Sequence, residues 1–201
     1  MAKAMCIAYE VDSGLYINMT NRCSNACDFC VRSHGDTVYG NLWLDREPTV
    51  DEVKESIFSR NLAEFSEIVF CGYGEPTERL EDILEICREI RKRSDIQIRI
   101  NTNGHSDLIN GRDTAAEFEG LFDVVSISLN TSDPKIYKEM CLPKFGGRAH
   151  MAIIDFAANV KNYVPRVVLS VVDTTITPED IETCRGIAED IGVEFRLREY
   201  I

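Results

Sequence analysis

The sequence predicts an α/β fold in which a parallel sheet is covered by helices. Six short runs rich in apolar and β-branched residues alternate, along the 201 residues, with longer stretches whose apolar positions recur at helical spacing. Strands that alternate with helices indicate βαβ units, whose neighbouring strands run parallel. No repeat, low-complexity tract or linker interrupts this alternation, so we predict one domain over residues 1–201.

The predicted strands are short and end at polar or turn-forming residues. Residues 15–20 read L-Y-I-N-M-T, and residues 96–102 read I-Q-I-R-I-N-T before the turn pair of Asn103 and Gly104. In chain order, the predicted strands cover residues 15–20, 67–71, 96–102, 124–130, 166–172 and 193–200.

Helices are predicted between the strands from capping signals and apolar spacing. Thr49 followed by Glu52 forms a capping box, which predicts a helix that continues to about residue 60. Residues 80–93 place an apolar stripe on one helix face, made of Leu80, Ile83, Leu84, Cys87 and Ile90. Further helices are predicted around residues 114–119, from residue 133, and over residues 149–162 and 177–191.

Alternation along the strands gives the sheet one apolar and one polar face. Side chains alternate between the two faces of a strand, so Arg99 and Asn101 lie opposite Ile98 and Ile100. A doubly wound sheet needs two apolar faces, whereas a curved sheet with a polar interior fits this pattern. We therefore predict a partial (β/α)6 barrel, similar to a TIM barrel, with the helices outside; a half-exposed sheet is the alternative. The polar face carries Arg99, Asn101, Ser126, Ser128, Asn130, Arg196, Arg198 and Tyr200.

Charge and hydropathy exclude some classes of partner. The formal net charge is −12, and the one dense basic run, residues 88–93, closes a predicted helix. Such a chain repels phosphate backbones, so we expect no non-specific binding of nucleic acid. No apolar run reaches membrane-spanning length, and the first ten residues lack the pattern of a signal peptide. We expect a cytoplasmic protein without membrane association.

Three of the eight cysteines, Cys23, Cys27 and Cys30, form a C-x3-C-x2-C cluster just after the first predicted strand. Together with His34 they could make a tetrahedral Cys3His zinc site. An iron–sulfur cubane usually takes four cysteines, so three would leave one iron open to an outside ligand. A redox dithiol formed by Cys27 and Cys30 is a third alternative, but it leaves Cys23 unexplained.

Polar and glycine-rich motifs follow the next strands at corresponding places. Residues 72–75 read G-Y-G-E after the second predicted strand, residues 101–104 read N-T-N-G after the third, and Ser128 and Asn130 end the fourth. The carboxyl ends of parallel strands meet at one edge of the sheet. These groups and the cysteines are therefore expected to share one site, which a lone zinc knuckle would not explain.

At this point the chain resembles the radical S-adenosylmethionine (SAM) superfamily. The motif C-x3-C-x-Φ-C, with Phe29 as the aromatic residue, is similar to the cluster motif of those enzymes, and the resemblance runs from the first to the last predicted strand. The phrases L-Y-I-N-M-T-N-R-C, I-V-F-C-G-Y-G-E-P-T, R-I-N-T-N-G, S-I-S-L-N and F-R-L-R-E-Y-I resemble the small members described as associated with TatD-family nucleases.

The resemblance implies roles for particular residues. Cys23, Cys27 and Cys30 would ligate a [4Fe–4S] cluster whose open iron takes the amino and carboxylate groups of SAM. Tyr73 departs from the commoner glycine, so it would contribute its backbone alone. The remaining SAM contacts implied are Phe29 near the adenine, Gly72, Gly74 and Glu75 near the amino group, and Asn103, Ser128, Asn130 and Arg198.

The same resemblance implies a reaction and partners. A reduced cluster would cleave SAM to a 5′-deoxyadenosyl radical, which abstracts hydrogen from either a small nucleotide-like metabolite or a protein activated in this way. Arg99 and Arg196 are expected to contact an anionic part of the substrate, and pairing with interior acids is their alternative. An electron donor such as flavodoxin or ferredoxin, and a second copy or partner protein over the barrel mouth, are expected in an anaerobic cytoplasm. We assign no role to His34, His105 or His150, and expect His105 in a surface turn.

Overall fold

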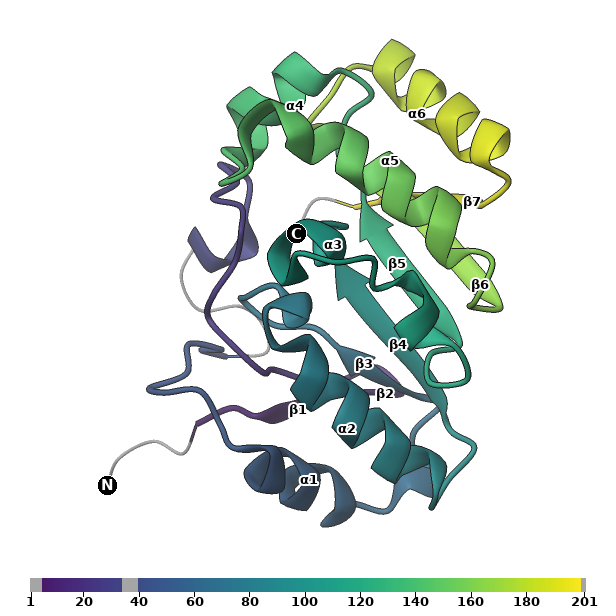
Figure 1. Ribbon diagram of the computed structural model, residues 1–201. Helices are drawn as coiled ribbons and strands as arrows, with labels where there is room; N and C mark the ends of the chain where they lie inside the picture. The colour runs from purple at the N-terminus through teal and green to yellow at the C-terminus, as the bar shows by residue number, and fades with distance from the viewer. Residues whose placement is uncertain (1–4, 34–39, 200–201) are drawn as a thin grey trace.

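A computed structural model of the chain, which describes residues 5–33 and 40–199, contains one seven-stranded sheet (Figure 1). The strand order follows the sequence, and β2 to β7 run parallel while β1 pairs antiparallel with β2. This arrangement confirms the predicted α/β fold with six parallel strands. The strands are β1 (Ala8–Val11), β2 (Gly14–Ile17), β3 (Glu67–Phe70), β4 (Gln97–Thr102), β5 (Val124–Ser128), β6 (Arg166–Val172) and β7 (Glu194–Arg198).

Strand β1 was not predicted. It forms a hairpin with β2 through Asp12, whose φ of 51° is left-handed, and Ser13. β1 has only four residues and too little alternation to stand out, whereas β2 was found because the strand-like run continues to residue 20. The antiparallel strand extends the sheet at the edge of the predicted barrel and leaves the order of the six parallel strands unchanged.

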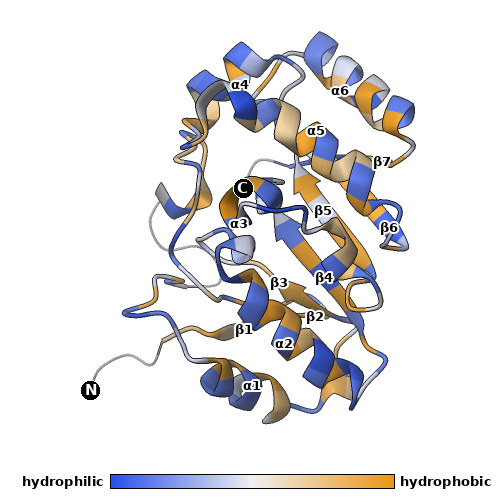
Figure 2. Ribbon diagram, in the orientation of Figure 1, coloured by the Kyte–Doolittle hydropathy of each residue, from blue (hydrophilic) through white to orange (hydrophobic). Residues whose placement is uncertain are grey.

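The helices lie outside the curved sheet (Figure 1) and turn their apolar sides towards it (Figure 2). The predicted helix at residues 114–119 is wrong: that segment is a 3-10 turn, Ala115–Phe118, and a short helix precedes it. The α-helices are α1 (Val50–Phe58), α2 (Leu80–Arg91), α3 (Ser106–Asn110), α4 (Pro134–Cys141), α5 (Ala149–Val160) and α6 (Pro178–Ile191).

The core fills the layer between the helices and the convex face of the sheet. Ile98, Ile100 and Ile127 are completely buried there, as are the predicted apolar stripe of α2 and the cysteines Cys87 and Cys184. The capping box of Thr49 and Glu52 at the start of α1 is confirmed. Burial of this continuous apolar layer is the main source of stability.

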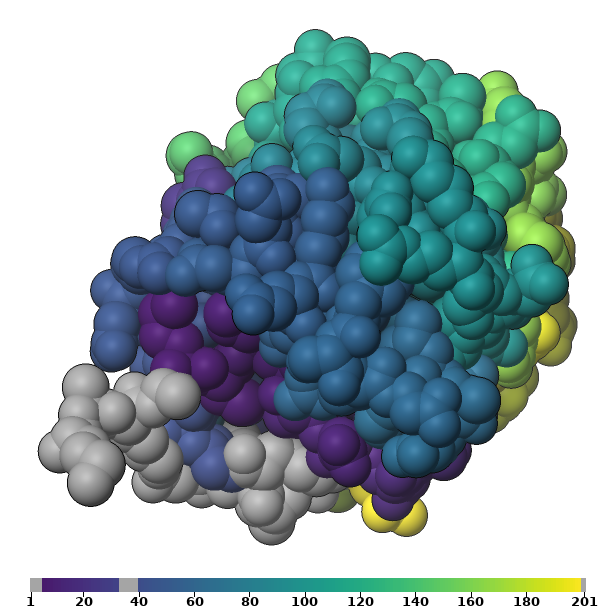
Figure 3. All heavy atoms as spheres, turned by 90° about the horizontal axis from the view of Figure 1, so that it is seen from below, coloured from purple at the N-terminus to yellow at the C-terminus, as the bar shows by residue number. Residues whose placement is uncertain are grey.

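The opposite, concave face is polar, as the alternation of residues predicted. It lines a cavity of about 520 Å³, and the first residue of every parallel strand contributes to its wall. A parallel sheet with an apolar outer face and a polar inner face is what a partial barrel requires. The view from below (Figure 3) shows the blue part of the chain, which includes α1, beside the purple N-terminal part. No helix in the described part of the chain is long and apolar enough to cross a membrane.

Candidate active site

The three clustered cysteines lie in the segment that follows β2, at the carboxyl end of the parallel strands. All three are free thiols that are partly exposed. Burial raises the pKa of the Cys23 thiol to about 12 and also raises the pKa of Cys30. Because a metal ligand must be the thiolate, iron has to displace these protons when it binds.

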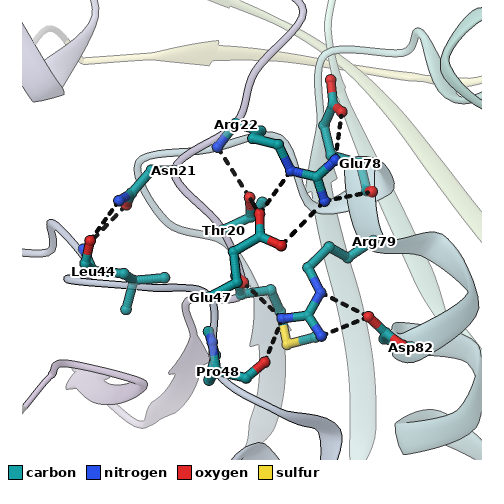
Figure 4. Close-up of polar contacts among 10 residues, drawn as sticks. Thr20, Asn21, Arg22, Leu44, Glu47, Pro48, Glu78, Arg79 and Asp82 are labelled. Atoms are coloured by element: carbon teal, nitrogen blue, oxygen red, sulfur yellow. Dashed lines mark hydrogen bonds and ion pairs between the residues drawn. The ribbon is translucent and has the colours of Figure 1, made fainter.

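A set of polar contacts fixes the segment just before Cys23 (Figure 4). Thr20 Oγ1 and Arg22 Nε both donate to Glu47 Oε1, at 2.5 and 2.7 Å. Asn21 exchanges two hydrogen bonds with the backbone of Leu44. Arg79 donates to the carbonyl oxygen of Pro48 at 2.6 Å and pairs with Asp82. The approach to Cys23 is thereby tied to the segment before α1 and to the start of α2.

The loop after β3 packs directly against this segment, and its glycines make that approach sterically possible. A Cβ atom at Gly72 would lie 2.1 Å from Asn18 Oδ1, and one at Gly74 would lie 2.2 Å from the carbonyl oxygen of Thr20. The backbone N–H of Glu75 donates to the carbonyl oxygen of Arg22 at 2.7 Å. The two glycines therefore allow the loop after β3 to contact the backbone of the segment before Cys23 closely, because they have no Cβ.

Glu75 is buried and joins the loop after β3 to the loop after β4. Its Oε1 accepts from the hydroxyls of Thr77 and Thr102, both at 2.7 Å, and its Oε2 accepts from the N–H of Asn103 at 2.7 Å. Burial raises the pKa of this carboxyl, and the hydrogen bonds oppose that rise. Tyr73 is also buried, with its ring 5.3 Å from that of Trp43, so its side chain faces the protein.

Asn103 connects β4 to the cysteine segment. Its Nδ2 donates to Ser24 Oγ at 2.9 Å and lies 3.8 Å from Cys23 Sγ. Its Oδ1 accepts from the N–H of His105 at 3.0 Å. Hydrogen bonds to a ligating sulfur influence the reduction potential of an iron–sulfur centre. Asn103 is thus placed to support a cluster ligand.

His105 does not lie in a surface turn, and that expectation is wrong. The residue is completely buried, with Nδ1 3.1 Å from Ser24 Oγ and Nε2 3.4 Å from the hydroxyl of Tyr137. The following residues form α3 instead of an exposed loop, which carries the ring inward. Asn25 Nδ2 donates to the same Tyr137 hydroxyl at 2.9 Å. Two residues of the cysteine segment are therefore held by one buried network.

The carboxyl end of α4 also contacts the cysteine segment. The N–H of Ala26 donates to the carbonyl oxygen of Cys141 at 2.9 Å, and the N–H of Asp28 donates to that of Met140 at 3.0 Å. The Cys141 thiol is completely buried, and its hydrogen bond with Cys27 raises the pKa of Cys27. No sequence pattern indicates this contact, since Cys141 stands 114 residues from Cys27.

The buried imidazole of His105 predicts a pH-dependent stability. Burial lowers its pKa from 6.5 to about 4, so the unfolded chain takes up a proton between these values that the folded chain does not. The stability that the neutral, buried ring contributes is complete above pH 6.5 and is lost as the pH falls towards 4. Unfolding free energy at pH 5 should be about 2 kcal/mol lower than at pH 7 from this group alone.

Urea unfolding of the wild type and of His105→Gln at several pH values measures this contribution. The difference in unfolding free energy between the two should shrink by about 2 kcal/mol from pH 7 to pH 5, because the variant lacks the titrating ring. A difference that stays constant with pH would show that the ring is not held neutral.

The ends of β5 and β7 bring further predicted residues to the same edge. Arg198 Nη2 lies 3.4 Å from Ser128 Oγ, and Arg198 Nε is buried without a hydrogen-bond partner among the described residues. Asn130 has a left-handed φ of 67°; its Nδ2 lies 3.5 Å from Cys141 Sγ, and its Oδ1 is buried and unpartnered. Buried polar atoms without partners mark places where a ligand can supply the missing contact.

The other predicted residues have different surroundings. Arg99 lies on the concave face, but both its guanidinium Nε and Nη2 bind Glu67, so the alternative of pairing with an interior acid holds for it. Arg196 lines the same cavity and is exposed. Phe29 is partly buried against the apolar core. Tyr200 and His34 lie outside the described residues.

The site fits an iron–sulfur cluster with a bound amino acid group. Thiolates are the preferred ligands of iron–sulfur clusters, and one loop presents three of them. The unpartnered guanidinium Nε of Arg198 and the unpartnered Oδ1 of Asn130 suit a ligand with a carboxylate and with hydrogen-bond donors. Among the described residues, no three His, Cys, Asp or Glu side chains converge as they would around a single metal ion.

The family is shown by a match along the sequence. The model of the Radical SAM superfamily matches residues 17–186, which include the cysteine segment and the parallel strands from β3 to β6. The chain belongs to the radical SAM superfamily. Members of this superfamily are enzymes that use a [4Fe–4S] cluster and SAM. The predicted cofactors are thereby confirmed at the level of the family, and the zinc alternative is not favoured.

Curated relatives include GTP 3',8-cyclases. The chain is 27% identical over 157 residues to the enzyme of Limosilactobacillus fermentum, which covers 78% of the chain and 44% of the relative. It is also 27% identical over 189 residues to the probable enzyme of Methanocaldococcus jannaschii, which covers 93% of the chain and 58% of the relative. The chain thus spans about half the length of these relatives.

Solved structures share the fold. Streptococcus suis SuiB bound to its precursor peptide SuiA superposes with a TM-score of 0.68 at 18% identity, covering 94% of this chain and 39% of that one. The anSMEcpe protein with bound AdoMet superposes with a TM-score of 0.65 at 20% identity, covering 92% and 50%. At such identities the likeness supports the partial barrel and nothing finer.

Proposed function

We propose that this chain is a radical SAM enzyme whose cluster is held by Cys23, Cys27 and Cys30. The cluster and SAM, when bound, supply a one-electron reductive cleavage that gives methionine and a 5′-deoxyadenosyl radical able to abstract hydrogen from a substrate. The observation that carries this proposal is the convergence of the three thiols, the Gly72–Glu75 loop, Asn103 and the half-buried Arg198 at the carboxyl ends of parallel strands.

The residues of the chain would bind and orient the two groups. Arg198, supported by Ser128, would bind the carboxylate of SAM, because a guanidinium matches a carboxylate and this one has an unpartnered Nε. Glu75, whose carboxylate is occupied by Thr77, Thr102 and Asn103, would act by fixing the backbone of Gly72, Tyr73 and Gly74 beside the SAM amino group.

Two other predicted contacts would complete the SAM site. Asn130 would use its unpartnered Oδ1 to accept a hydrogen bond from the ribose or the methionyl part. Asn103 would act mainly on the cluster, since its Nδ2 already points to Ser24 and Cys23. Phe29, between Cys27 and Cys30, would lie near the adenine.

The substrate and the partners are proposed at a coarser level. The curated relatives are named for GTP, which supports a nucleotide-like metabolite over a protein activated by radical formation. A place among the small proteins associated with TatD-family nucleases is proposed on the sequence phrases alone. We propose a flavodoxin or ferredoxin as electron donor, because the cluster must first be reduced by one electron. We propose an anaerobic cytoplasm as the setting, because such a cluster is sensitive to oxygen.

Formation of 5′-deoxyadenosine tests the proposal. The protein is reconstituted anaerobically with iron and sulfide, reduced with dithionite and given SAM, and the products are measured by mass spectrometry. We expect 5′-deoxyadenosine and methionine from the wild type, and loss of both product and cluster absorbance in Cys27→Ala. Cys184→Ala, which removes a completely buried thiol from α6, serves as the matched control and should keep both.

The rival functions predict different results. A zinc protein would retain zinc and build no cluster on reconstitution. A thiol oxidoreductase that uses Cys27 and Cys30 would keep its activity in Cys23→Ala. Either result, or equal 5′-deoxyadenosine from the wild type and Cys27→Ala, would contradict the proposed function.

A further inference from the structure

Two arginines on β7 face the inside of the partial barrel and form no ion pair with a carboxylate of the described residues. Arg196 and Arg198 stand two residues apart, so their side chains share one face of the strand. Burial is the first cause that lowers the pKa of Arg198, and the charge of Arg196 lowers it further. Two neighbouring cations repel each other, so this arrangement favours bound anions.

The acids that begin β3 and β7 are already occupied. Glu67 binds Arg99 through both oxygens, at 3.0 and 2.6 Å, and Glu194 binds Arg166 through both oxygens, at 2.8 and 2.6 Å. Each of these pairs is bidentate, the strongest geometry for a guanidinium and a carboxylate. Asp12, the remaining acid of the cavity wall, lies on the turn between β1 and β2, at the opposite edge of the sheet.

The cavity has the size of a small-molecule site. Its volume of about 520 Å³ falls within the range of roughly 300–1,000 Å³ typical of pockets for small ligands. Its wall is made from the first residues of the parallel strands, whereas the cysteines follow the last residue of β2. Arg196 pairs with Ser170, and Ser170 pairs with Ser128, so Arg196 lies on the side of the cavity that is nearer the carboxyl ends of the strands.

We propose that Arg196 binds the anionic group, a carboxylate or a phosphate, of a small-molecule substrate held in this cavity. This inference rests on the proposed function and names the class of its substrate. Arg196 lies about 7 Å along β7 from Arg198, which would hold the carboxylate of SAM. Arg196 would thus bind the anionic group of the substrate, and Arg198 would bind the carboxylate of SAM. The paired Arg99 shapes the wall and has little capacity left for the substrate.

Anion binding can be measured directly on the reconstituted protein with SAM present. Calorimetric titrations with inorganic phosphate and with succinate serve as probes, and the tighter of the two distinguishes a phosphate from a carboxylate substrate. We expect saturable binding that weakens as salt is added, and a loss of roughly 10–100-fold in affinity in Arg196→Gln, as for a hydrogen-bonded charged group. Thermal unfolding should be unchanged, since Arg196 is exposed.

Arg185→Gln is the matched control. It removes the same charge from the same region, but Arg185 lies on α6, over the ring of Phe195 on the other face of β7. Its affinity for the probes should equal that of the wild type. Failure of both probes to bind the wild type, or an equal loss in Arg185→Gln, would overturn the inference.

Production of 5′-deoxyadenosine in the same samples separates the two proposals. If 5′-deoxyadenosine forms and neither probe binds, the anionic-substrate inference fails while the proposed function stands. If a probe binds through Arg196 and no 5′-deoxyadenosine forms, the proposed function fails and Arg196 remains an anion site.

Discussion

Alanine at position 74 should destabilise the protein by about 2–3 kcal/mol, the upper part of the range for overpacked positions. A Cβ there would lie 2.2 Å from the carbonyl oxygen of Thr20 and 2.6 Å from that of Arg22, and both of these atoms belong to backbone. Backbone cannot rotate away as a flexible side chain can, so the segment before Cys23 must move. Gly74→Ala should therefore also reduce the iron bound per chain after reconstitution.

Gly186→Ala is the same chemical change as Gly74→Ala, but it should stabilise the protein. Gly186 lies inside α6 and has open space where a Cβ would be added. Alanine there should stabilise the protein by about 0.5–1 kcal/mol, because glycine costs that much in a helix interior. Urea unfolding and iron content measured on both variants test the pair. A Gly74→Ala protein as stable and as rich in iron as the wild type would refute the close contact between the two loops.

The fold was predictable because its signals are local and repeated. Six parallel strands and the helices α1, α2, α5 and α6 each carry enough apolar periodicity to be found from the sequence. The elements that were missed are short: β1 has four residues, and α3 has five. β2 and β3 are as short as β1, but each belongs to a longer strand-like run of the sequence. In elements of that length, pairing and packing decide the conformation more than the sequence pattern does.

The site was predictable in its motifs but not in its supports. The cysteines, the Gly-Tyr-Gly-Glu loop and Asn103 are continuous motifs at the ends of strands, so the rule for parallel sheets brings them together. His105 precedes α3, and Tyr137 and Cys141 lie on α4, so they meet the cysteine segment only in the folded chain. Their distance from the cysteines in the sequence leaves no pattern to detect.

Arg198→Met should raise stability and weaken SAM binding at once. The guanidinium has one long contact, 3.4 Å to Ser128 Oγ, and a buried Nε without a partner. Burial lowers the pKa of this guanidinium, which shows that its charge is unfavourable in the protein without a ligand. Replacing such a charge by an apolar side chain of similar length should add about 1–3 kcal/mol to the unfolding free energy without SAM.

The cost of that substitution should appear in the affinity for SAM. Loss of a charge-assisted hydrogen bond to the SAM carboxylate corresponds to roughly 10–100-fold weaker binding. Equilibrium dialysis of SAM against the reconstituted protein measures this change, and urea unfolding of the protein without SAM measures the gain in stability. Arg185→Met, which changes an exposed arginine on the outer side of β7, should leave SAM affinity unaltered.

The combination of the two changes distinguishes a binding residue from a structural one. If Arg198 were structural, replacing it would lower the unfolding free energy of the protein. SAM affinity would then fall because part of the protein is unfolded. If Arg198 serves to bind a ligand, its replacement should raise the unfolding free energy and lower the affinity for SAM, as we expect here. A different result, in which SAM affinity falls in Arg196→Met and not in Arg198→Met, would assign the carboxylate of SAM to Arg196. That carboxylate would then lie about 7 Å deeper in the barrel.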